Sequence, residues 1–235
     1  MTDHGADWVR VHLLTEPTRR AIFEVVRTAR APMTRDEVAA ESGVSRRLAA
    51  FHLDQLAEGG LLSVDYARPA GRRSGPGAGR PAKRYRAEAV EVEVSVPPRR
   101  YDLTARVLAR AIAEPGTGSA HDRAVMIAAE EGRRLGGARR SGRRMSADRS
   151  LEATAEVLAD LGYEPSRDGS CVRLRNCPFH AIVDVAPALV CGLNDALIGG
   201  ILDGMDASES VTAALDGEPP DCCVTVAKRR AGAQK

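Results

Sequence analysis

Apolar positions recur at helical spacing three times in the first sixty residues of the chain. The pattern predicts helices over residues 15–29, 34–43 and 45–60. Ser45 stands immediately before the third helix, where its hydroxyl can accept a hydrogen bond from a free backbone N–H group. A tight turn separates the second helix from the third, so these two helices predict a helix–turn–helix.

Two short strands are predicted after the third helix, over residues 61–66 and 83–87. Gly, Pro and Arg dominate the segment between them. A hairpin with a basic tip that directly follows a helix–turn–helix forms a wing, so residues 1–88 are predicted to fold as a winged-helix domain. In such a domain the second helix of the motif lies in the major groove of DNA.

The middle of the chain, residues 89–146, is predicted to link two domains and to dimerise. Valines that alternate with polar residues favour a half-buried strand over residues 91–100. Helical patterns follow over residues 101–114 and 119–138.

The last part of the chain, residues 147–227, combines helical and strand patterns. Helices are predicted over residues 150–163, with Ser150 as N-cap, and 187–205, and strands over residues 170–177, 210–216 and 222–227. Residues 228–235 are expected to be a disordered tail. The fold class is therefore α+β, with an N-terminal winged helix–turn–helix, a helical linker and dimerisation region, and a C-terminal α/β sensor domain.

Composition narrows the class of protein. Hydrophobic residues make up 43% of the chain, which suffices for a folded core, and no run of about eighteen apolar residues could span a membrane. The N-terminus lacks the basic-then-apolar pattern of a signal peptide, so we expect a cytoplasmic protein without a membrane partner. The chain has no P-loop, no dinucleotide-binding glycine motif and no G-x-S-x-G, so we expect it not to be an enzyme.

Charge is distributed unevenly, although the formal net charge is only +2. Residues 67–86 hold seven basic residues and no acidic one, whereas residues 150–227 hold three basic and thirteen acidic residues. This asymmetry favours a front half that binds a polyanion such as duplex DNA and a rear half with a different task. DNA contacts are predicted at Ser45, Arg46, Arg47 and His52 of the third helix, and at Arg80, Lys83 and Arg84 of the wing.

The cysteines are confined to the last third of the chain, at Cys171, Cys177, Cys191, Cys222 and Cys223. Cys177 follows a predicted strand, Cys191 lies in the first turn of a predicted helix, and Cys222 and Cys223 begin a predicted strand. Such element ends can converge at one rim of an α/β layer, and thiolates are ligands for zinc, copper(I) and iron–sulfur clusters. His180 is a candidate additional ligand, and Cys171 is expected to be structural. Alternatively the cysteines are small buried hydrophobic residues, because free Cys is often buried.

Several motifs together resemble a known family. The GRPAKRYR wing, the SVPPRRYDL junction and the C-terminal NCPFH, LVCGLN and CC segments resemble SufR-type regulators. These are ArsR/DeoR-like winged-helix repressors of iron–sulfur cluster assembly operons in bacteria. The resemblance spans nearly the whole chain, the NCPFH and VCGLN pairing is its most specific part, and the composition is typical of actinobacterial members.

The resemblance implies a homodimer that binds an inverted repeat in double-stranded DNA. It also implies a cluster, usually [4Fe–4S], held by Cys177, Cys191 and one of Cys222 or Cys223. Side chains alternate between the two faces of a strand, so only one of these adjacent cysteines is expected to be a ligand.

We therefore expect a DNA-binding transcriptional regulator, a repressor, that senses iron–sulfur or redox status through a C-terminal cysteine-ligated cluster. The alternative is a winged-helix regulator that senses zinc or a small apolar ligand, with structural cysteines and either zinc or no cofactor. A hypothesis from a different functional class is a thiol enzyme in which His180 acts as the base. No third group that would orient this base is visible in the sequence.

Overall fold

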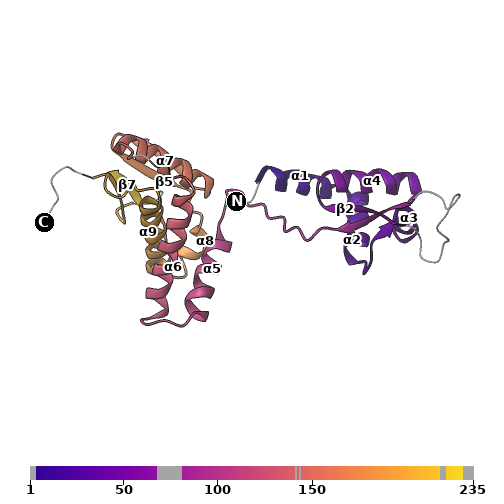
Figure 1. Cartoon of the computed structure of the whole chain (residues 1–235), viewed down its shortest axis with the longest axis horizontal. Coiled ribbons are helices and arrows are strands. Elements are labelled where there is room, and N and C mark those ends of the chain that lie inside the picture. Colours follow the sequence, from indigo (N-terminus) through magenta and orange to yellow (C-terminus); the bar gives the residue numbers. More distant parts are fainter. Residues whose placement is uncertain (1–3, 68–80, 141, 143, 218–220, 230–235) are drawn as a thin grey trace. The chain divides into compact units, whose positions relative to one another are not determined.

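The computed structural model describes residues 4–67, 81–140, 142, 144–217 and 221–229. The chain divides into two compact units, Met1–Val94 and Ser95–Lys235 (Figure 1). Each unit has its own cluster of buried apolar side chains. None of the described helices is long and apolar enough to cross a membrane.

The N-terminal unit is a small helical bundle against a short sheet. Its helices are α1 (His4–Thr15), α2 (Pro17–Thr28), α3 (Arg35–Ser42) and α4 (Arg46–Glu58). Fully buried side chains from three of these helices form the core with Tyr85, namely Ile22, Val38, Leu53 and Leu56. The helix–turn–helix predicted from the sequence corresponds to α3 and α4, and α1 was not predicted.

Local sequence signals set the ends of α3 and α4. Thr34 and Glu37 form a reciprocal capping box at the start of α3. Gly43 ends this helix in the left-handed conformation, with a φ of 68°, which glycine adopts without steric cost. The Ser45 side chain accepts a hydrogen bond from the backbone N–H of Leu48 at 3.2 Å, which confirms the predicted N-cap of α4.

The sheet of the N-terminal unit contains the predicted hairpin. Strands β2 (Leu62–Ala67) and β3 (Ala82–Ala87) pair antiparallel, and the two-residue β1 (Met33–Thr34) pairs with the other edge of β3. The tip of the wing, residues 68–80, lies outside the described residues. The fold is a helix–turn–helix followed by an antiparallel hairpin.

The prediction of a strand over residues 91–100 is wrong. This segment has no regular structure, although Val92 packs against the N-terminal core. Val96 is 77% exposed, so the alternation of valines does not mark the buried face of a sheet.

The C-terminal unit contains five helices and four strands among its described residues. They are α5 (Tyr101–Ala113), α6 (Ala120–Gly137), α7 (Ala147–Asp160), β4 (Glu164–Asp168), β5 (Cys171–Arg175), α8 (His180–Val183), α9 (Pro187–Gly204), β6 (Val211–Ala214) and β7 (Thr225–Lys228). The strands form one antiparallel sheet in the order β4-β5-β7-β6, and α7 packs against it (Figure 1). The helices predicted between residues 101 and 138 are α5 and α6, and they pack inside this unit.

Two boundaries in the C-terminal unit differ from the sequence prediction. Helix α7 begins after Ser146, whose side chain accepts from the Arg149 N–H, so the predicted N-cap at Ser150 is wrong. Ser150 is instead buried, and its hydroxyl shares a hydrogen bond with Ser210. Strand β4 and helix α8 were not predicted from the sequence. Strand β7 begins at Thr225 and not at residue 222.

The centre of the C-terminal unit is a close crossing of α6 and α9, which lie side by side in Figure 1. Glycines at four positions allow the backbones to touch: Gly132, Gly136, Gly200 and Gly204. A Cβ atom at any of them would lie 2.1–2.3 Å from a carbonyl oxygen of the facing helix. The crossing therefore tolerates no side chain on either helix at these points.

Candidate functional sites

The structure brings four of the five cysteines to one pocket in the C-terminal unit. Cys177, Cys191, Cys222 and Cys223 line a cavity of about 620 Å³, together with Arg99, His180 and other side chains. Cys171 lies on β5, where it pairs with Asp168 and Ala227, and it does not line this cavity. The four cysteines of this set are called the cysteine pocket below.

Three separate segments carry the pocket cysteines. Cys177 lies in the turn between β5 and α8. Cys191 is the fifth residue of α9, beyond its first turn, so the predicted first-turn position is wrong and the helix dipole acts more weakly there. Cys222 and Cys223 lie in the loop before β7, so the expectation that a strand points them to opposite faces does not apply. Both of them line the pocket.

The thiols of the pocket interact with one another. Hydrogen bonds from the thiols of Cys177 and Cys223 lower the pKa of Cys222 well below its usual range. The hydrogen bond to Cys222 and burial raise the pKa of Cys177. The hydrogen bond to Cys222 and burial likewise raise the pKa of Cys223. Cys223 also contacts the side chain of Cys191, so all four sulfurs form one connected group.

Two buried polar side chains behind the pocket were missed by the sequence analysis. Asn194, which is fully buried on α9, donates from Nδ2 to the Cys222 sulfur at 3.1 Å. The hydroxyl of Tyr163 donates to Asn194 Oδ1. Burial raises the pKa of Tyr163 well above its usual value, so this hydroxyl keeps its proton. The sequence contained one signal for Asn194, because it is a polar residue on the apolar face of the predicted helix, three positions after Cys191.

A second missed group joins the pocket to the segment that leads from the N-terminal unit. The Arg99 guanidinium donates to Asn176 Oδ1 and, at 3.1 Å, to the Cys177 carbonyl. The Arg100 backbone N–H donates to the Pro178 carbonyl at 3.1 Å. Asn176 donates in turn to the carbonyls of Pro98 at 3.4 Å and Gly162 at 2.7 Å. Residues 98–100 are therefore hydrogen-bonded to the loop that carries Cys177.

His180 begins α8, lines the pocket and is exposed. Among the described residues, no group of three or more His, Cys, Asp or Glu side chains is arranged to hold a metal ion. The donor set of four thiols is nevertheless that of a soft-metal or iron–sulfur site. The residue types present are therefore suitable as ligands of a cluster or of a soft metal ion.

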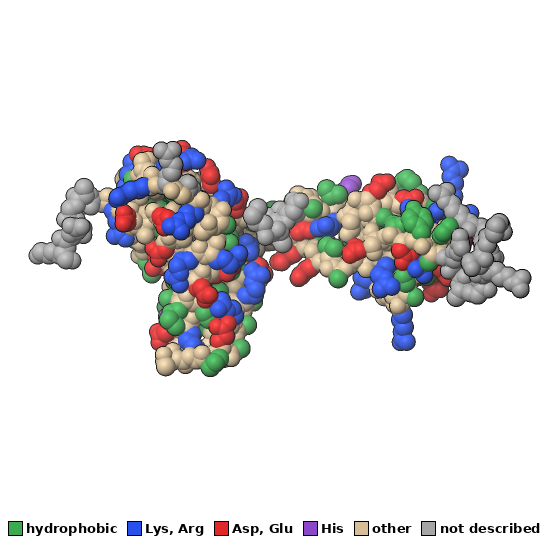
Figure 2. Space-filling model, in the orientation of Figure 1, with side chains coloured by type: hydrophobic (Ala, Val, Ile, Leu, Met, Phe, Trp, Pro, Cys, Tyr) green, Lys and Arg blue, Asp and Glu red, His purple; other side chains and the backbone are tan. Residues whose placement is uncertain are grey.

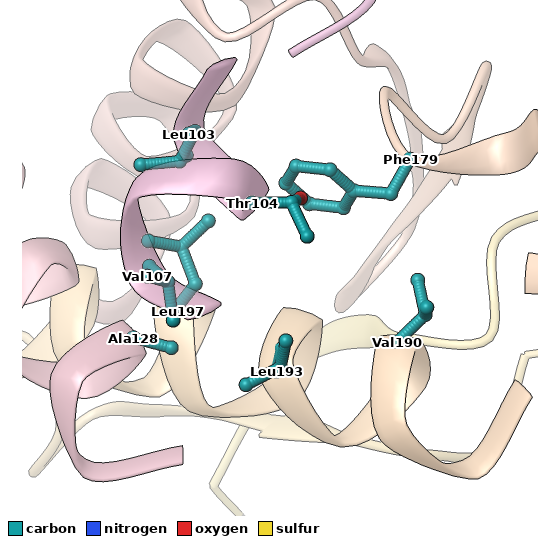
Figure 3. A pocket seen from close by; sticks show the side chains of 8 residues that line it. All are labelled: Leu103, Thr104, Val107, Ala128, Phe179, Val190, Leu193 and Leu197. Carbon is teal, nitrogen blue, oxygen red and sulfur yellow. The ribbon is translucent and has the colours of Figure 1, made fainter. Parts of the chain in front are cut away.

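An apolar cavity lies behind the loop that carries Cys177. Side chains of α5, α6 and α9 line this cavity together with Phe179 (Figure 3). They are Leu103, Thr104 and Val107 of α5, Ala128 of α6, and Val190, Leu193 and Leu197 of α9. Its volume is about 20 Å³, which is room for about one water molecule. Phe179 is two residues from Cys177 and Val190 adjoins Cys191, so this cavity and the cysteine pocket share their supporting elements.

The candidate DNA-binding surface is the outer face of α4 and the start of β3. Arg46 and Arg47 are both exposed on α4; Arg46 forms an ion pair with Asp36, and Arg47 has no ion pair with any described residue. The Ser45 hydroxyl is engaged as the helix cap.

The predicted position of His52 on the exposed face is wrong. His52 is 6% exposed and its ring faces inward, with Nε2 3.7 Å from Glu16. Burial lowers the pKa of His52. The helical turn places residue 52 beside Ala49, Leu53 and Leu56 on the core side, so it is unavailable to DNA in this unit.

Two of the basic residues predicted to contact DNA from the wing, Lys83 and Arg84, form ion pairs with carboxylates. Lys83 forms an ion pair with Asp54 of α4, and Arg84 binds both oxygens of Asp65 at 2.8 and 2.9 Å. Tyr85 adds a hydrogen bond to Asp54 at 2.8 Å, which fixes the hairpin against α4. Arg80 lies outside the described residues. Figure 2 shows basic and acidic side chains interspersed on the visible face of the C-terminal unit.

Comparison with known proteins agrees with the N-terminal fold. Residues 14–65 match the family model of a helix-turn-helix domain. No curated protein and no solved structure matches the chain.

The matched segment runs from the end of α1 into β2 and contains the whole α3–α4 motif. The fold of the N-terminal unit and this match support a winged-helix type of domain. A helix-turn-helix domain suggests a DNA-binding transcriptional regulator.

Proposed function

We propose that this chain is a cytoplasmic, homodimeric transcriptional repressor that binds an inverted-repeat operator and senses iron–sulfur or redox status through its cysteine pocket. The observation that carries the sensing function is the convergence of Cys177, Cys191, Cys222 and Cys223 in one cavity. Three segments far apart in sequence supply these thiols, so loading or oxidation of the pocket would tie those segments together. We propose no enzymatic activity.

The residues proposed to hold the cluster are Cys177, Cys191 and one or both of Cys222 and Cys223, with His180 as a further candidate at the rim. A bound cluster would supply sensitivity to oxidants and to iron supply. Asn194 donates a hydrogen bond to one of these sulfurs, and the Arg99 cation lies in the same cavity. Hydrogen bonds and positive charge near thiolate ligands stabilise them and tune their chemistry.

The route from the pocket to DNA is proposed to run through residues 98–100. They are bonded to the Cys177 loop, and they continue through residues 95–97 into the N-terminal unit. A change at Cys177 would alter the segment that connects the two units. In a dimer this segment sets the spacing of the two α4 helices, which must match half-sites about 34–36 Å apart.

The first test is an absorption spectrum of protein purified without oxygen, with iron and sulfide assays on the same sample. We expect a broad band near 400 nm and stoichiometric iron and sulfide. Cys191→Ser is expected to abolish the band and to change DNA affinity. Cys171→Ser is the matched control because Cys171 lies on β5 in the same unit and does not line the pocket, and it should leave both unchanged.

A colourless protein that stays colourless after reconstitution with iron and sulfide would contradict the cluster. Unchanged DNA affinity on oxidation of the thiols would in addition contradict redox sensing. The alternative is then a zinc-responsive regulator, for which the thiol donor set is also suitable. The cavity of Figure 3 gives little support to a small apolar ligand, because its 20 Å³ volume is too small to enclose one.

A further inference from the structure

The outer face of α4 carries two large apolar side chains. Leu48 is 40% exposed and Phe51 is 55% exposed. Residues three positions apart lie on the same side of a helix, with Cβ atoms about 5–6 Å apart. Leu53 and Leu56 of the same helix are fully buried in the core of the unit, and Leu48 and Phe51 do not belong to that core. Apart from an edge-to-face contact of the Phe51 ring with His52, at 5.3 Å between ring centroids, the exposed pair does not contribute to the core of the described domain.

The surroundings of this apolar pair indicate its partner. Arg46 and Arg47 lie at the N-terminal end of the same helix and are exposed, whereas the acidic residues of α4, Asp54 and Glu58, lie at its other end. Lys83 neutralises Asp54 through an ion pair. The pair is thus flanked by two arginines at the helix end that winged-helix proteins direct into the major groove; Arg46 is paired with Asp36, and Arg47 has no ion pair with any described residue. Duplex DNA matches both the charge and the shape of this face.

We infer that Leu48 and Phe51 select the DNA sequence by packing against the 5-methyl groups of thymine. Thymine alone among the four bases presents a methyl group in the major groove, and apolar side chains such as Phe contact it. The spacing of the two side chains corresponds to one or two base-pair steps of about 3.4 Å each. Each half-site of the preferred operator therefore contains thymine at two positions that are one or two base-pair steps apart. This inference rests on the proposed DNA-binding function.

The test begins with the full-length protein and a pool of random duplexes, from which bound sequences are selected and read. The selected duplex is then synthesised with deoxyuridine in place of thymine at one position at a time. This exchange removes only the methyl group and leaves base pairing intact. Binding is measured by fluorescence anisotropy at one fixed salt concentration. At two positions in each half-site we expect about a fourfold loss of affinity per methyl group removed, with no loss at other thymines.

Two variants connect this loss to the named side chains. Phe51→Ala and Leu48→Ala are each expected to bind the thymine duplex more weakly and to lose sensitivity to deoxyuridine at one of the two positions. Ile112→Ala removes a side chain that is 75% exposed on α5, in the other unit. This control should keep the full response to deoxyuridine. The measurement on unaltered protein does not depend on how the variants fold.

The outcomes separate this inference from the function on which it rests. If no sequence is enriched and no duplex binds, the DNA-binding function fails and the inference fails with it. If a motif is enriched but deoxyuridine duplexes bind as tightly as thymine duplexes, only the inference is overturned. The same holds if both alanine variants keep the wild-type response to deoxyuridine.

Discussion

At the scale of single residues, the most informative group is the buried chain that runs from Tyr163 through Asn194 to Cys222. The amide of Asn194 is held by Tyr163 on one side and points at the Cys222 sulfur on the other. Asn194 donates at 3.1 Å to Cys222 but lies 4.0 Å from the Cys223 sulfur. The cysteines themselves could be singled out from sequence because their residue type carries the chemistry. Tyr163 could not, because its partner is 31 residues away.

Tyr163→Phe removes one hydroxyl and leaves Asn194 Oδ1 buried without that donor. We expect a loss of about 1–3 kcal/mol in the free energy of unfolding, because the acceptor stays desolvated. Urea denaturation at pH 7 measures this loss. Tyr66→Phe removes the same group from a side chain that is 63% exposed and should change stability by less than about 0.5 kcal/mol. Equal effects of the two substitutions would contradict the role of the buried hydrogen bond.

His52 gives a pH dependence whose sign follows from its burial. Burial lowers the pKa of His52 in the folded protein below the ordinary value of about 6.5. The unfolded chain then binds the proton more readily, so the stability due to neutral His52 is present above about pH 6.5 and is lost as the pH falls through the folded pKa. Chemical denaturation between pH 8 and pH 5 should therefore show a smaller loss of stability on acidification for His52→Gln than for the unaltered protein. Parallel curves for His52→Gln and the unaltered protein would refute the assignment.

At the scale of elements, local signals explain which helices and strands were predicted. Caps at Thr34 and Ser45 and the stop at Gly43 depend on neighbouring residues only, so the helix–turn–helix was predicted close to its observed bounds. The segment 91–96 has the alternation of a strand but no partner strand, and pairing is not encoded locally. Convergence of the cysteine-bearing loops was expected from the sequence as a possibility, but their contacts depend on the tertiary packing of α9 and β7.

The α6–α9 crossing provides a test at this scale with two adjacent glycines. At Gly200 a Cβ atom would lie 2.1 Å from the Ala129 carbonyl oxygen, whereas at Gly199 it would meet nothing within 4 Å. Gly200→Ala is expected to destabilise the C-terminal unit by about 3 kcal/mol or more, because backbone must move to admit the methyl group. Gly199→Ala should be neutral or stabilising by up to about 1 kcal/mol through helix propensity. Thermal unfolding followed by circular dichroism compares the two, and similar melting temperatures would contradict the observed contact.

At the scale of the whole molecule, the question is how the C-terminal unit communicates with the N-terminal one. In the proposed function this connection runs through the Cys177 loop, which the contacts of Arg99 and Asn176 support. Their signal in the sequence was weak, since an arginine beside a proline pair and an asparagine before a cysteine are common.

Arg99→Ala should uncouple the two units. We expect the difference in DNA affinity between the reduced and oxidised forms of this variant, compared with the unaltered protein at equal metal and sulfide content, to shrink by about tenfold. Binding titrations on both forms measure this difference. Arg149→Ala is the control, because Arg149 forms an exposed ion pair with Glu152 on α7. A full response in Arg99→Ala would place the connection elsewhere.

The four glycines between α6 and α9 make the contact of these two helices rigid. Where two backbones touch, no side chain can rotate to absorb a small displacement, so the helices shift together or not at all. Cys191 is fixed to one of these helices, and α5 packs on the other. We therefore expect a movement of about an ångström at the cysteine pocket to be transmitted along α9 and α6 to α5 with little loss.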